Sequence, residues 1–296
     1  MKNTATDIPP AFSDRGRTRR LTVAVEGGLC NRMRAILSAA GVAGETGCAV
    51  RVAWSDKAEC GCRFEDVFMP VTAGVSGIPE NFSVVPARLC DIPAARRNLW
   101  LPALLRRTYY TAQRRNFNAS GNDDVLSLLS RYSSVYVSTC YEFFDAPLKM
   151  GELFRPSPRV REITERLAAT FGANTVGMHI RAGDNAMSLK YSPLPLFIEK
   201  ARQELSLRPD TVFFLATDSR EAKSEFIRLF GKKVIVSNGV LSRSTVEGMQ
   251  YAAADLFALA RTARIYGSYY SSFSGTAAEI GNIPIEILKV QSSSRN

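Results

Sequence analysis

The sequence contains a single histidine, His179, among its 296 residues. A zinc site of mixed cysteine and histidine ligands would therefore lack a second imidazole. Six cysteines are present, but only Cys60 and Cys62 lie close together, and no Cys-x-x-Cys pairs repeat. We expect no metal site. Reduced, mostly buried thiols of a cytoplasmic protein are favoured, and the spacing leaves a disulfide elsewhere open.

Long apolar runs are also missing. Stretches such as 99–105, which contains a proline, are far too short to span a bilayer. The first twenty residues are polar and basic without an apolar segment, so we expect no secretory signal. With 46% apolar and 22% charged residues, the chain can still form the core of one large domain or two ordinary ones.

Acidic residues are few relative to basic ones, with 28 Asp and Glu against 38 Lys and Arg, a formal charge of +10. Residues 1–20 carry a net +3, and 88–115 hold seven arginines and one aspartate, a net +6. We expect 1–20 to be a disordered arm. The arginines of 88–115 form either a solvated face or a docking site for an acidic or lipid-linked acceptor at a membrane surface. No nucleic-acid-binding module accompanies them, so a nucleic-acid partner is not favoured.

The order of predicted elements indicates an α/β fold. Strands are predicted over 21–25, 49–54, 134–139, 175–180, 211–216, 233–236, 264–267 and 285–288. Helices are predicted over 32–44, 99–117, 125–131, 159–171, 193–206, 220–230, 246–260 and 276–281. Such alternation implies parallel sheets covered on both faces.

Two prolines, Pro156 and Pro158, disfavour a continuous helix and indicate a hinge between two lobes. The predicted organisation is an arm over 1–20, an N-terminal lobe over 21–152, a C-terminal lobe over 153–290 and a tail over 291–296.

Two common nucleotide motifs are absent. No Gly-Lys-Ser/Thr P-loop and no Gly-x-Gly-x-x-Gly after a strand occurs, so neither a nucleotide hydrolase nor a dinucleotide enzyme is supported. Ligands of an open parallel sheet bind beyond the carboxyl ends of its strands. Four polar segments are predicted at such ends, namely 26–34, 179–184, 217–219 and 271–276.

The segment 179–184 places Arg181 just past a buried strand, with His179 two residues earlier on the same side of that strand. A guanidinium at this position can bind two phosphate oxygens through a pair of parallel hydrogen bonds. The alternative is a structural ion pair between Arg181 and Asp184.

Polar groups follow two other strands. Asp218, between Thr217 and Ser219, can accept hydrogen bonds from a ribose or a base; alternatively, Asp218 or Ser219 caps the next helix. The serines of 271–276 open a helix whose N-terminus can bind an anion, the alternative being a plain polar cap.

The segment 26–34 contains the best-placed carboxylate in the first half for proton abstraction, Glu26. Gly27 and Gly28 follow it and would let the backbone approach a ligand. The alternative is a turn with a solvated glutamate.

Four stretches, taken together, carry a resemblance to a known family. They are Gly27-Gly28-Leu29-Cys30-Asn31-Arg32-Met33-Arg34, His179-Ile180-Arg181-Ala182-Gly183-Asp184, Ala216-Thr217-Asp218-Ser219 and Ser272-Phe273-Ser274. In this order they resemble the fucosyltransferase superfamily of nodulation, core α-1,6- and protein O-fucosyltransferases. The resemblance covers about 30–55 and 150–290. It implies a GT-B fold, with two Rossmann-like lobes of mostly parallel sheets, a cleft between them, and GDP-fucose held mainly by the C-terminal lobe.

The resemblance also implies roles for individual residues. Arg181 would bind the β-phosphate and stabilise the leaving GDP, and Asp218 would recognise guanine or ribose. The remaining donor-binding residues would be His179, Asp184, Thr217, Ser219, Ser272, Phe273 and Ser274. On the acceptor side it implies Gly27, Gly28, Asn31 and Arg34, with Glu26 as the base. The enzyme would be inverting, with no metal and no permanently bound cofactor.

These features predict a transferase that moves fucose from GDP-fucose to a hydroxyl of a glycan acceptor. A related transferase that uses another nucleotide sugar such as GDP-mannose is one alternative. The other is a basic protein without enzymatic activity that binds nucleic acid or a membrane surface. We expect the protein in the cytoplasm, peripheral to the inner face of the membrane.

Overall fold

The computed structural model describes residues 19–57, 59–72, 74, 77–92, 100–118 and 124–290. The predicted arm therefore lies outside the described residues except for its last two positions, and the tail 291–296 lies wholly outside them. The chain divides into two compact units. The first comprises the described residues up to Glu26 with Arg34–Trp54 and Thr72–Leu148, and the second comprises Gly27–Met33, Ser55–Val71 and the described residues from Lys149 onward.

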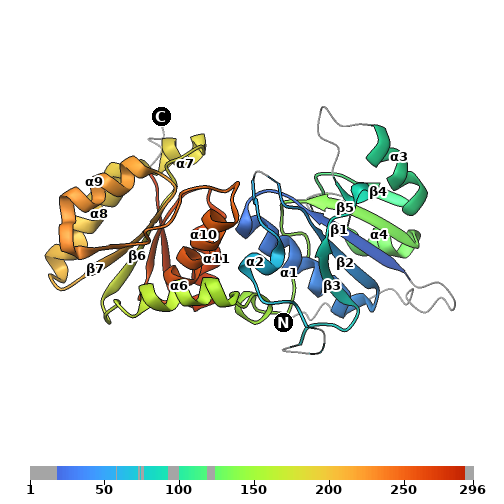
Figure 1. Cartoon of the computed structure of the whole chain (residues 1–296), viewed down its shortest axis with the longest axis horizontal. Coiled ribbons are helices and arrows are strands. Elements are labelled where there is room, and N and C mark those ends of the chain that lie inside the picture. Colours follow the sequence, from blue (N-terminus) through green and yellow to red (C-terminus); the bar gives the residue numbers. More distant parts are fainter. Residues whose placement is uncertain are drawn as a thin grey trace, which may run out of the picture. The chain divides into compact units, whose positions relative to one another are not determined.

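The first unit contains a sheet of five parallel strands in the order β3-β2-β1-β5-β4 (Figure 1). The strands are β1 Arg20–Val25, β2 Ala49–Trp54, β3 Phe82–Pro86, β4 Ala112–Arg114 and β5 Ser134–Thr139. In the central strand, Val23 stands opposite Val52 of β2 and Val137 of β5. All three valines are fully buried, as expected for strands covered on both faces.

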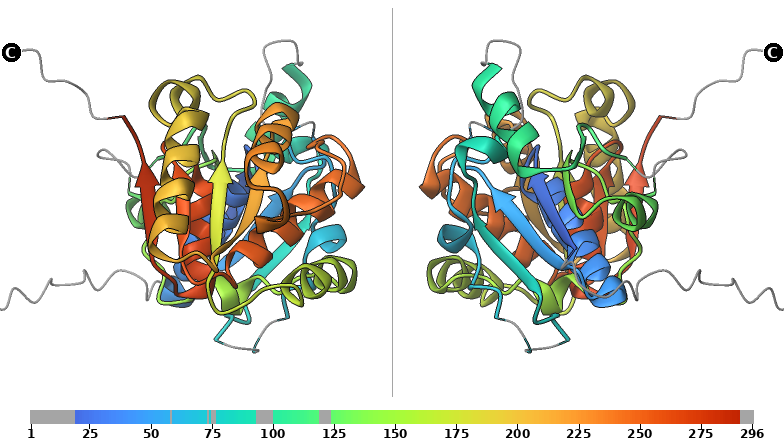
Figure 2. Two further views of the ribbon diagram at one scale, coloured as in Figure 1. Left: turned by 90° about the vertical axis from the view of Figure 1, so that its left-hand side faces the viewer. Right: turned by 90° about the vertical axis from the view of Figure 1, so that its right-hand side faces the viewer.

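The second unit contains a second parallel sheet, in the order β10-β9-β6-β7-β8, whose strands run in one direction (Figure 2). These strands are β6 Thr175–Ile180, β7 Val212–Thr217, β8 Val234–Val236, β9 Ile265–Ser268 and β10 Ile285–Leu288. The α/β class and the parallel sheets predicted from the sequence are confirmed.

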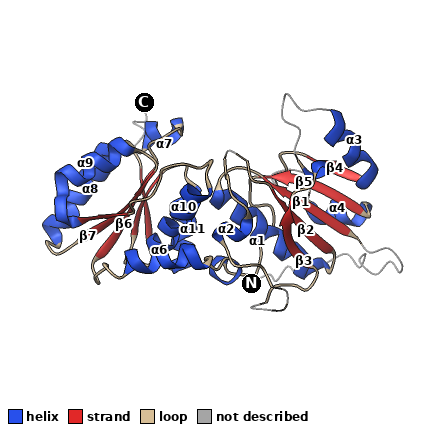
Figure 3. Ribbon diagram, in the orientation of Figure 1, coloured by secondary structure: helices blue, strands red, loops and turns tan. Residues whose placement is uncertain are grey.

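Helices cover both faces of the second sheet (Figure 3). Helices α8 Leu194–Leu207 and α9 Arg220–Phe230 lie on one side, and α10 Val246–Leu259 and α11 Ser272–Gly281 lie on the other. Met178 and Ile180 of β6 are buried on the α8 and α9 side. Because side chains alternate along a strand, His179 faces α11 instead.

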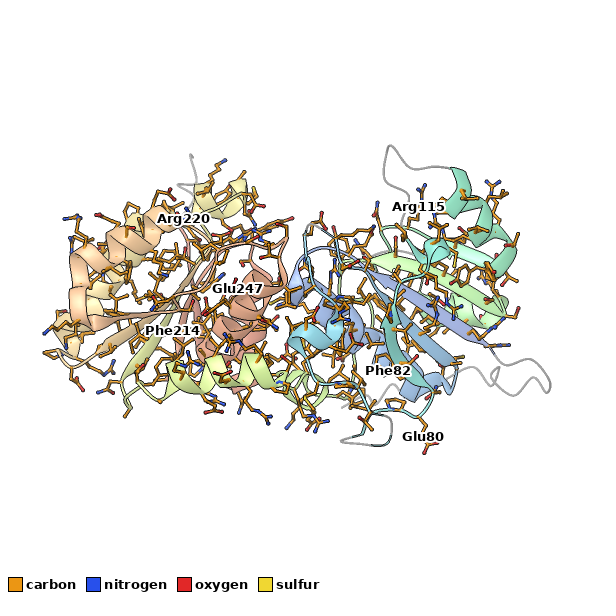
Figure 4. All side chains as sticks on the ribbon, viewed as in Figure 1. Glu80, Phe82, Arg115, Phe214, Arg220 and Glu247 are labelled. Atoms are coloured by element: carbon orange, nitrogen blue, oxygen red, sulfur yellow. The ribbon has the colours of Figure 1, made fainter. Side chains whose placement is uncertain are left out.

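The other α-helices of the described residues are distributed over both units. They are α1 Leu29–Thr46, α2 Phe64–Val67, α3 Trp100–Tyr109, α4 Val125–Arg131, α5 Met150–Leu153, α6 Pro158–Ala168 and α7 Ala186–Tyr191. Side chains fill the interior on the α6 side as well: Phe214, labelled in Figure 4, is fully buried and its ring contacts that of Phe171.

The helix predicted over 99–117 is wrong in its second half. Helix α3 ends at Tyr109, and Ala112–Arg114 form the edge strand β4. The backbone N–H of Thr111 donates to the carbonyl of Ser134 at 2.8 Å, and β4 then pairs in parallel with β5. Pairing with β5 satisfies the backbone N–H and C=O groups of 112–114. The local sequence pattern, which is helical, does not reveal this long-range pairing.

The break predicted at the paired prolines is confirmed, since α5 ends at Leu153 and α6 begins at Pro158. The segment between them is bound to residues 66–69. Met69 donates its N–H to the carbonyl of Arg155 at 2.8 Å, and Ser157 donates to that of Val67 at 3.0 Å. The segment Ser55–Val71 therefore belongs to the second unit although it precedes β3 in the chain.

Candidate functional site

The carboxyl ends of β6, β7 and β9 lie at one edge of the second sheet, because the three strands are parallel. Arg181, the first residue beyond β6, is fixed there by Ser268. The backbone N–H of Arg181 donates to Oγ of Ser268 at 2.9 Å. The Ser268 hydroxyl in turn donates to the carbonyl oxygen of His179 at 3.2 Å. The end of β9 thus positions the start of the loop 181–184.

An ion cluster of two arginines and two aspartates occupies this edge. Arg181 pairs with Asp218 through one terminal nitrogen and with Asp184 through the other. Arg243 pairs with Asp184 at 2.9 Å and lies 3.4 Å from Asp218. The Arg181–Asp184 pair expected as the structural alternative is therefore present, but within a four-residue cluster. The side chain of Arg181 is 18% exposed.

Burial disfavours ionisation of Asp184, but its hydrogen bond from Arg243 and the charge of Arg181 outweigh that cost. They hold the pKa of Asp184 below its ordinary value. The site therefore contains two fixed cations and at least one carboxylate that stays ionised.

Asp218 also organises the backbone after β6. Its Oδ1 accepts the N–H groups of Ala182 and Gly183, each at 2.9 Å. A Cβ on Gly183 would lie 2.8 Å from Oδ2 of Asp218. Glycine is needed at 183 because the carboxylate approaches the backbone this closely.

Sequence reasoning missed Arg243. It lies in the irregular segment before α10, between two serines, and no local pattern marks it. The tertiary structure holds it through Gly61, whose N–H donates to the carbonyl of Arg243 at 2.7 Å. A Cβ on Gly61 would lie 2.5 Å from the carbonyl carbon of Ser244, so the two backbones are in close contact.

His179 stacks on Phe273 of α11, with ring centroids 4.9 Å apart and an interplanar angle of 21°. The imidazole is buried, and its Nδ1 has no hydrogen-bond partner among the described residues. Burial, reinforced by the charge of Arg181 and opposed by that of Asp218, lowers the pKa of His179 to about 4. The ring is neutral at physiological pH and can offer one acceptor and one donor.

Helix α11 begins beside this ring. Ser272 donates its hydroxyl to Oδ1 of Asn31 at 2.8 Å. The hydroxyls of Ser274 and Thr276 are fully buried and have no partner among the described residues. A Cβ on Gly267 would lie 2.3 Å from Oγ of Ser274, so β9 approaches this helix closely. Hydroxyls and the N–H groups of a first helical turn are suited to an anion.

The hydrogen bond between Asn31 and Ser272 brings the loop that contains Gly27 and Gly28 (the glycine loop) to α11. It joins a residue predicted on the acceptor side to one predicted on the donor side. Helix α1 begins at Leu29, directly after Gly27 and Gly28. Gly27 has φ of +76°, which glycine adopts without strain, whereas a Cβ on Gly28 would meet nothing within 4 Å. Two helix N-termini, of α1 and α11, thus lie in the second unit near the same hydrogen bond.

Arg32 fixes the glycine loop through side-chain hydrogen bonds. Its buried side chain donates to the carbonyl of Gly27 at 2.8 Å and to that of Ser55 at 2.6 Å.

The residues after β7 divide into two roles. Ser219 caps α9, since its hydroxyl accepts the N–H of Ala222 at 3.1 Å and donates to Glu221 at 2.8 Å. The helix-cap alternative is therefore confirmed for Ser219 and not for Asp218. Thr217 accepts the N–H of Ser219 at 3.2 Å and stabilises the turn.

Glu26 and Arg34 belong to the first unit. The backbone N–H of Glu26 donates to the carbonyl of Thr139 at 2.9 Å, which continues the pairing of β1 with β5. Arg34 lies half-buried on α1.

A buried carboxyl, Asp255, was also missed. Ser237, one residue past β8, donates to its Oδ2 at 3.1 Å, and Oδ1 has no partner among the described residues. Burial, only partly offset by the Ser237 hydrogen bond and the charge of Lys223, raises the pKa of Asp255 to about 7. One sequence signal was available: an aspartate interrupts the otherwise apolar stretch 252–260.

Within the described part of the chain, no three His, Cys, Asp or Glu side chains are grouped as metal ligands would be. No described helix combines the length and apolarity needed to cross a bilayer.

Two Rossmann-like units, each built on a five-stranded parallel sheet, define the GT-B class of fold. No protein-family model and no curated protein matches the sequence. Solved fucosyltransferases do match the structure. NodZ, an α-1,6-fucosyltransferase soaked with GDP-fucose, aligns with a TM-score of 0.62 at 17% identity over 90% of this chain and 94% of that one.

Two other solved structures are similar. A mutant of FUT1 from Arabidopsis thaliana in complex with GDP aligns with a TM-score of 0.61 at 13% identity, over 91% of this chain and 70% of that one. POFUT1 in complex with GDP-fucose aligns with a TM-score of 0.54 at 12% identity, over 90% and 97%. At these identities the likeness shows a shared fold, and it confirms the fold that the sequence resemblance implied.

Proposed function

We propose that this protein is a glycosyltransferase that moves fucose from GDP-fucose to a hydroxyl of a glycan acceptor. The observation that carries the proposal is Arg181, held by Asp218 at the carboxyl edge of the sheet. The first turn of α11, the helix that carries Phe273 against His179, would add backbone N–H donors. The shared fold with proteins crystallised with GDP-fucose or GDP supports this choice of donor.

In the proposed reaction the acceptor oxygen attacks C1 of fucose. The bond from C1 to the β-phosphate oxygen breaks, and its electron pair leaves with GDP, while the acceptor proton passes to a base. Arg181 and the first turn of α11 would stabilise the negative charge that develops on the diphosphate. A single displacement inverts C1, and because these cationic and N–H groups carry the charge, the proposed reaction is metal-independent.

The ion cluster suggests how the diphosphate enters. Asp184 is 69% exposed, so Arg181 and Arg243 can exchange it for a phosphate at small cost. Asp218 is held by two backbone N–H groups and would keep Arg181 in place throughout.

The same geometry bears on recognition of the base. The carboxylate of Asp218 is engaged by Arg181 and the backbone, whereas Oδ1 of Asp255 retains acceptor capacity. We therefore propose Asp255, and not Asp218 alone, as an acceptor for the N–H groups of guanine.

The role of Glu26 as the general base that accepts the acceptor proton stays a prediction.

Calorimetric titration with GDP, followed by a transfer assay with GDP-fucose, tests this function. Arg181→Ala should abolish transfer in a folded protein, and Arg181→Lys should recover little because a lysine cannot form the bidentate contact. The loss expected is about 10²–10³-fold. Arg228→Ala, which removes an exposed arginine of α9, is the matched control. Near wild-type turnover in Arg181→Ala would contradict the donor site.

A thermal-shift comparison of GDP, UDP, ADP and their sugars distinguishes GDP-fucose from another donor such as GDP-mannose. Stabilisation by GDP-mannose but not by GDP-fucose would favour the alternative transferase.

We also propose that the acceptor is lipid-linked and that α3 meets the membrane surface. Arg88, Arg107 and Arg115 are exposed, and Leu101 and Leu104 of α3 are 38% and 48% exposed. Arg115 is labelled in Figure 4. Exposed leucines beside arginines suit an anionic bilayer.

Not every arginine of 88–115 contributes to that surface. Arg106 is buried, donates to the carbonyl of Cys90 at 3.3 Å and lies over the ring of Tyr136. Arg96 and Arg97 lie outside the described residues. A position at the inner face of the membrane, in the cytoplasm, stays a prediction.

A further inference from the structure

Two buried thiols lie side by side next to the ion cluster. The Sγ atoms of Cys60 and Cys62 are 3.9 Å apart, and both side chains are at most 1% exposed. No disulfide joins any of the six cysteines, and the Sγ atoms of Cys60 and Cys62 are in contact. Neither thiol has a role in the proposed transfer reaction.

The backbone already presents the two thiols to one another. The N–H of Cys60 donates to the carbonyl of Lys57 at 2.8 Å, and that of Cys62 donates to the carbonyl of Cys60 at 2.9 Å. This tight turn places both side chains on the same side. A disulfide needs the sulfurs at about 2.05 Å, so they must approach by roughly 2 Å, which side-chain rotation and a small backbone shift can provide.

We propose that Cys60 and Cys62 form a redox-active dithiol, which a peroxide converts to a disulfide, and that this conversion weakens binding at the candidate donor site. The second half of this statement rests on the proposed function. The first half stands on the thiol geometry alone.

The chemistry balances with hydrogen peroxide as the oxidant. The thiolate of Cys60 attacks one peroxide oxygen, the O–O bond breaks, and the products are a sulfenic acid and hydroxide, which takes up a proton to become water. The thiol of Cys62 then attacks the sulfenic sulfur, the S–S bond forms, and the oxygen leaves as water. Two thiols and one peroxide thus give one disulfide and two waters.

The pairing of the two thiols favours a thiolate on Cys60. The hydrogen bond from the Cys62 thiol, together with the charge of Arg32, outweighs burial and lowers the pKa of Cys60, whereas the same pairing and burial raise the pKa of Cys62. The thiolate, and not the thiol, reacts with peroxide.

The residue between the cysteines connects them to the site. Gly61 donates its N–H to the carbonyl of Arg243, and its Cα is packed against Ser244 with no room for a side chain. Drawing the two sulfurs together must change the backbone at Gly61, and therefore the position of Arg243. Arg243 in turn holds Asp184 and Asp218, the partners of Arg181.

Peptide mapping of the full-length protein tests the disulfide. Trypsin cleaves after Lys57 and Arg63, so one peptide, 58–63, contains both cysteines and no others. After peroxide treatment of the native protein this peptide should be two mass units lighter and resist alkylation until a reductant is added. A peptide that stays fully alkylatable, or oxidises only to sulfinic acid, would overturn the dithiol assignment.

Calorimetry with GDP tests the coupling. Oxidised wild type should bind GDP roughly fivefold or more weakly than reduced wild type, a typical allosteric coupling, and a reductant should restore binding. Cys60→Ser and Cys62→Ser should each be insensitive to peroxide, whereas Cys140→Ser should respond as wild type does.

The outcomes separate the two proposals. If reduced protein binds GDP and oxidised protein binds it equally well, the coupling is wrong. If reduced protein fails to bind GDP, the proposed function fails, while the peptide map still decides the dithiol.

Discussion

Gly183 and Asp218 are in contact so close that a Cβ on the glycine would lie 2.8 Å from the carboxylate. The same carboxylate accepts the glycine's N–H at 2.9 Å. The loop after β6 is therefore bound to the end of β7 through one side chain, and that side chain also holds Arg181. The position of the cation depends on this contact.

Gly183→Ala should displace Asp218 and, with it, Arg181. We expect a loss of about 1–3 kcal/mol in stability from overpacking. Calorimetry should show weaker GDP binding. Gly172→Ala is the matched control, because a Cβ there meets nothing within 4 Å. An equal and small effect of both substitutions would show that the contact does not position the cluster.

His179 should stay neutral down to a pH of about 5, because its pKa is about 4. The unfolded chain, with an ordinary histidine pKa near 6.5, binds this proton more tightly, so stability should fall as the pH drops from about 6.5 to about 4. The full effect is about 3 kcal/mol. Since the chain has one histidine, its proton NMR signal needs no assignment. A signal that titrates near pH 6.5 in the folded protein would refute the prediction.

Asp255 should change stability with pH in the direction opposite to His179. Its pKa of about 7 exceeds the value of 3.8 for a free aspartate, so the folded protein binds the proton more tightly. Stability should therefore fall as the pH rises from about 4 to about 7. Asp255→Asn should remove this loss, whereas Glu247→Gln, an exposed change on the same helix, should keep the wild-type dependence.

These two effects overlap in pH and oppose one another in the wild type. Urea unfolding between pH 4.5 and 7 should therefore show a nearly flat stability. His179→Phe should unmask a decline with rising pH, and Asp255→Asn should unmask an increase. Parallel pH profiles for wild type and both variants would contradict the two pKa values.

The α3 surface should bind anionic vesicles. Replacing Leu101 and Leu104 by serine and Arg107 by glutamate should abolish co-sedimentation with vesicles that contain phosphatidylglycerol, because both apolar insertion and charge attraction are lost. Leu207→Ser with Arg228→Glu changes an exposed leucine and an exposed arginine elsewhere, and should leave binding unchanged. Equal sedimentation of wild type with pure phosphatidylcholine and with anionic vesicles would count against a charge-dependent membrane contact.

The local pattern was sufficient for many elements. The strands 49–54, 134–139, 175–180 and 285–288 and the helix 125–131 were predicted at the bounds that the structure has. Each is a short run with strong periodicity or β-branched residues, bounded by turn residues. The positions of Arg181, Asp218 and Ser272 at strand or helix ends followed from the same alternation.

Long-range pairing decided what the pattern could not. β4 forms because β5 offers it an open edge, and no local feature of 112–114 requires a strand there. Arg243 and Asp255 reach the carboxyl edge of the second sheet from α10 and the segment before it. Their neighbours, Asp184 and Ser237, are 59 and 18 residues away in the chain.

The sequence by itself determined the alternation of strands and helices, the polar strand ends and the resemblance to fucosyltransferases, because these depend on residue type and short-range spacing. Only the tertiary structure decided which side chains meet there. It paired Asn31 with Ser272 and Gly61 with Arg243, and it turned an Arg181–Asp184 pair into a cluster of four. Such contacts arise because packing distant segments together buries polar groups that must then find partners.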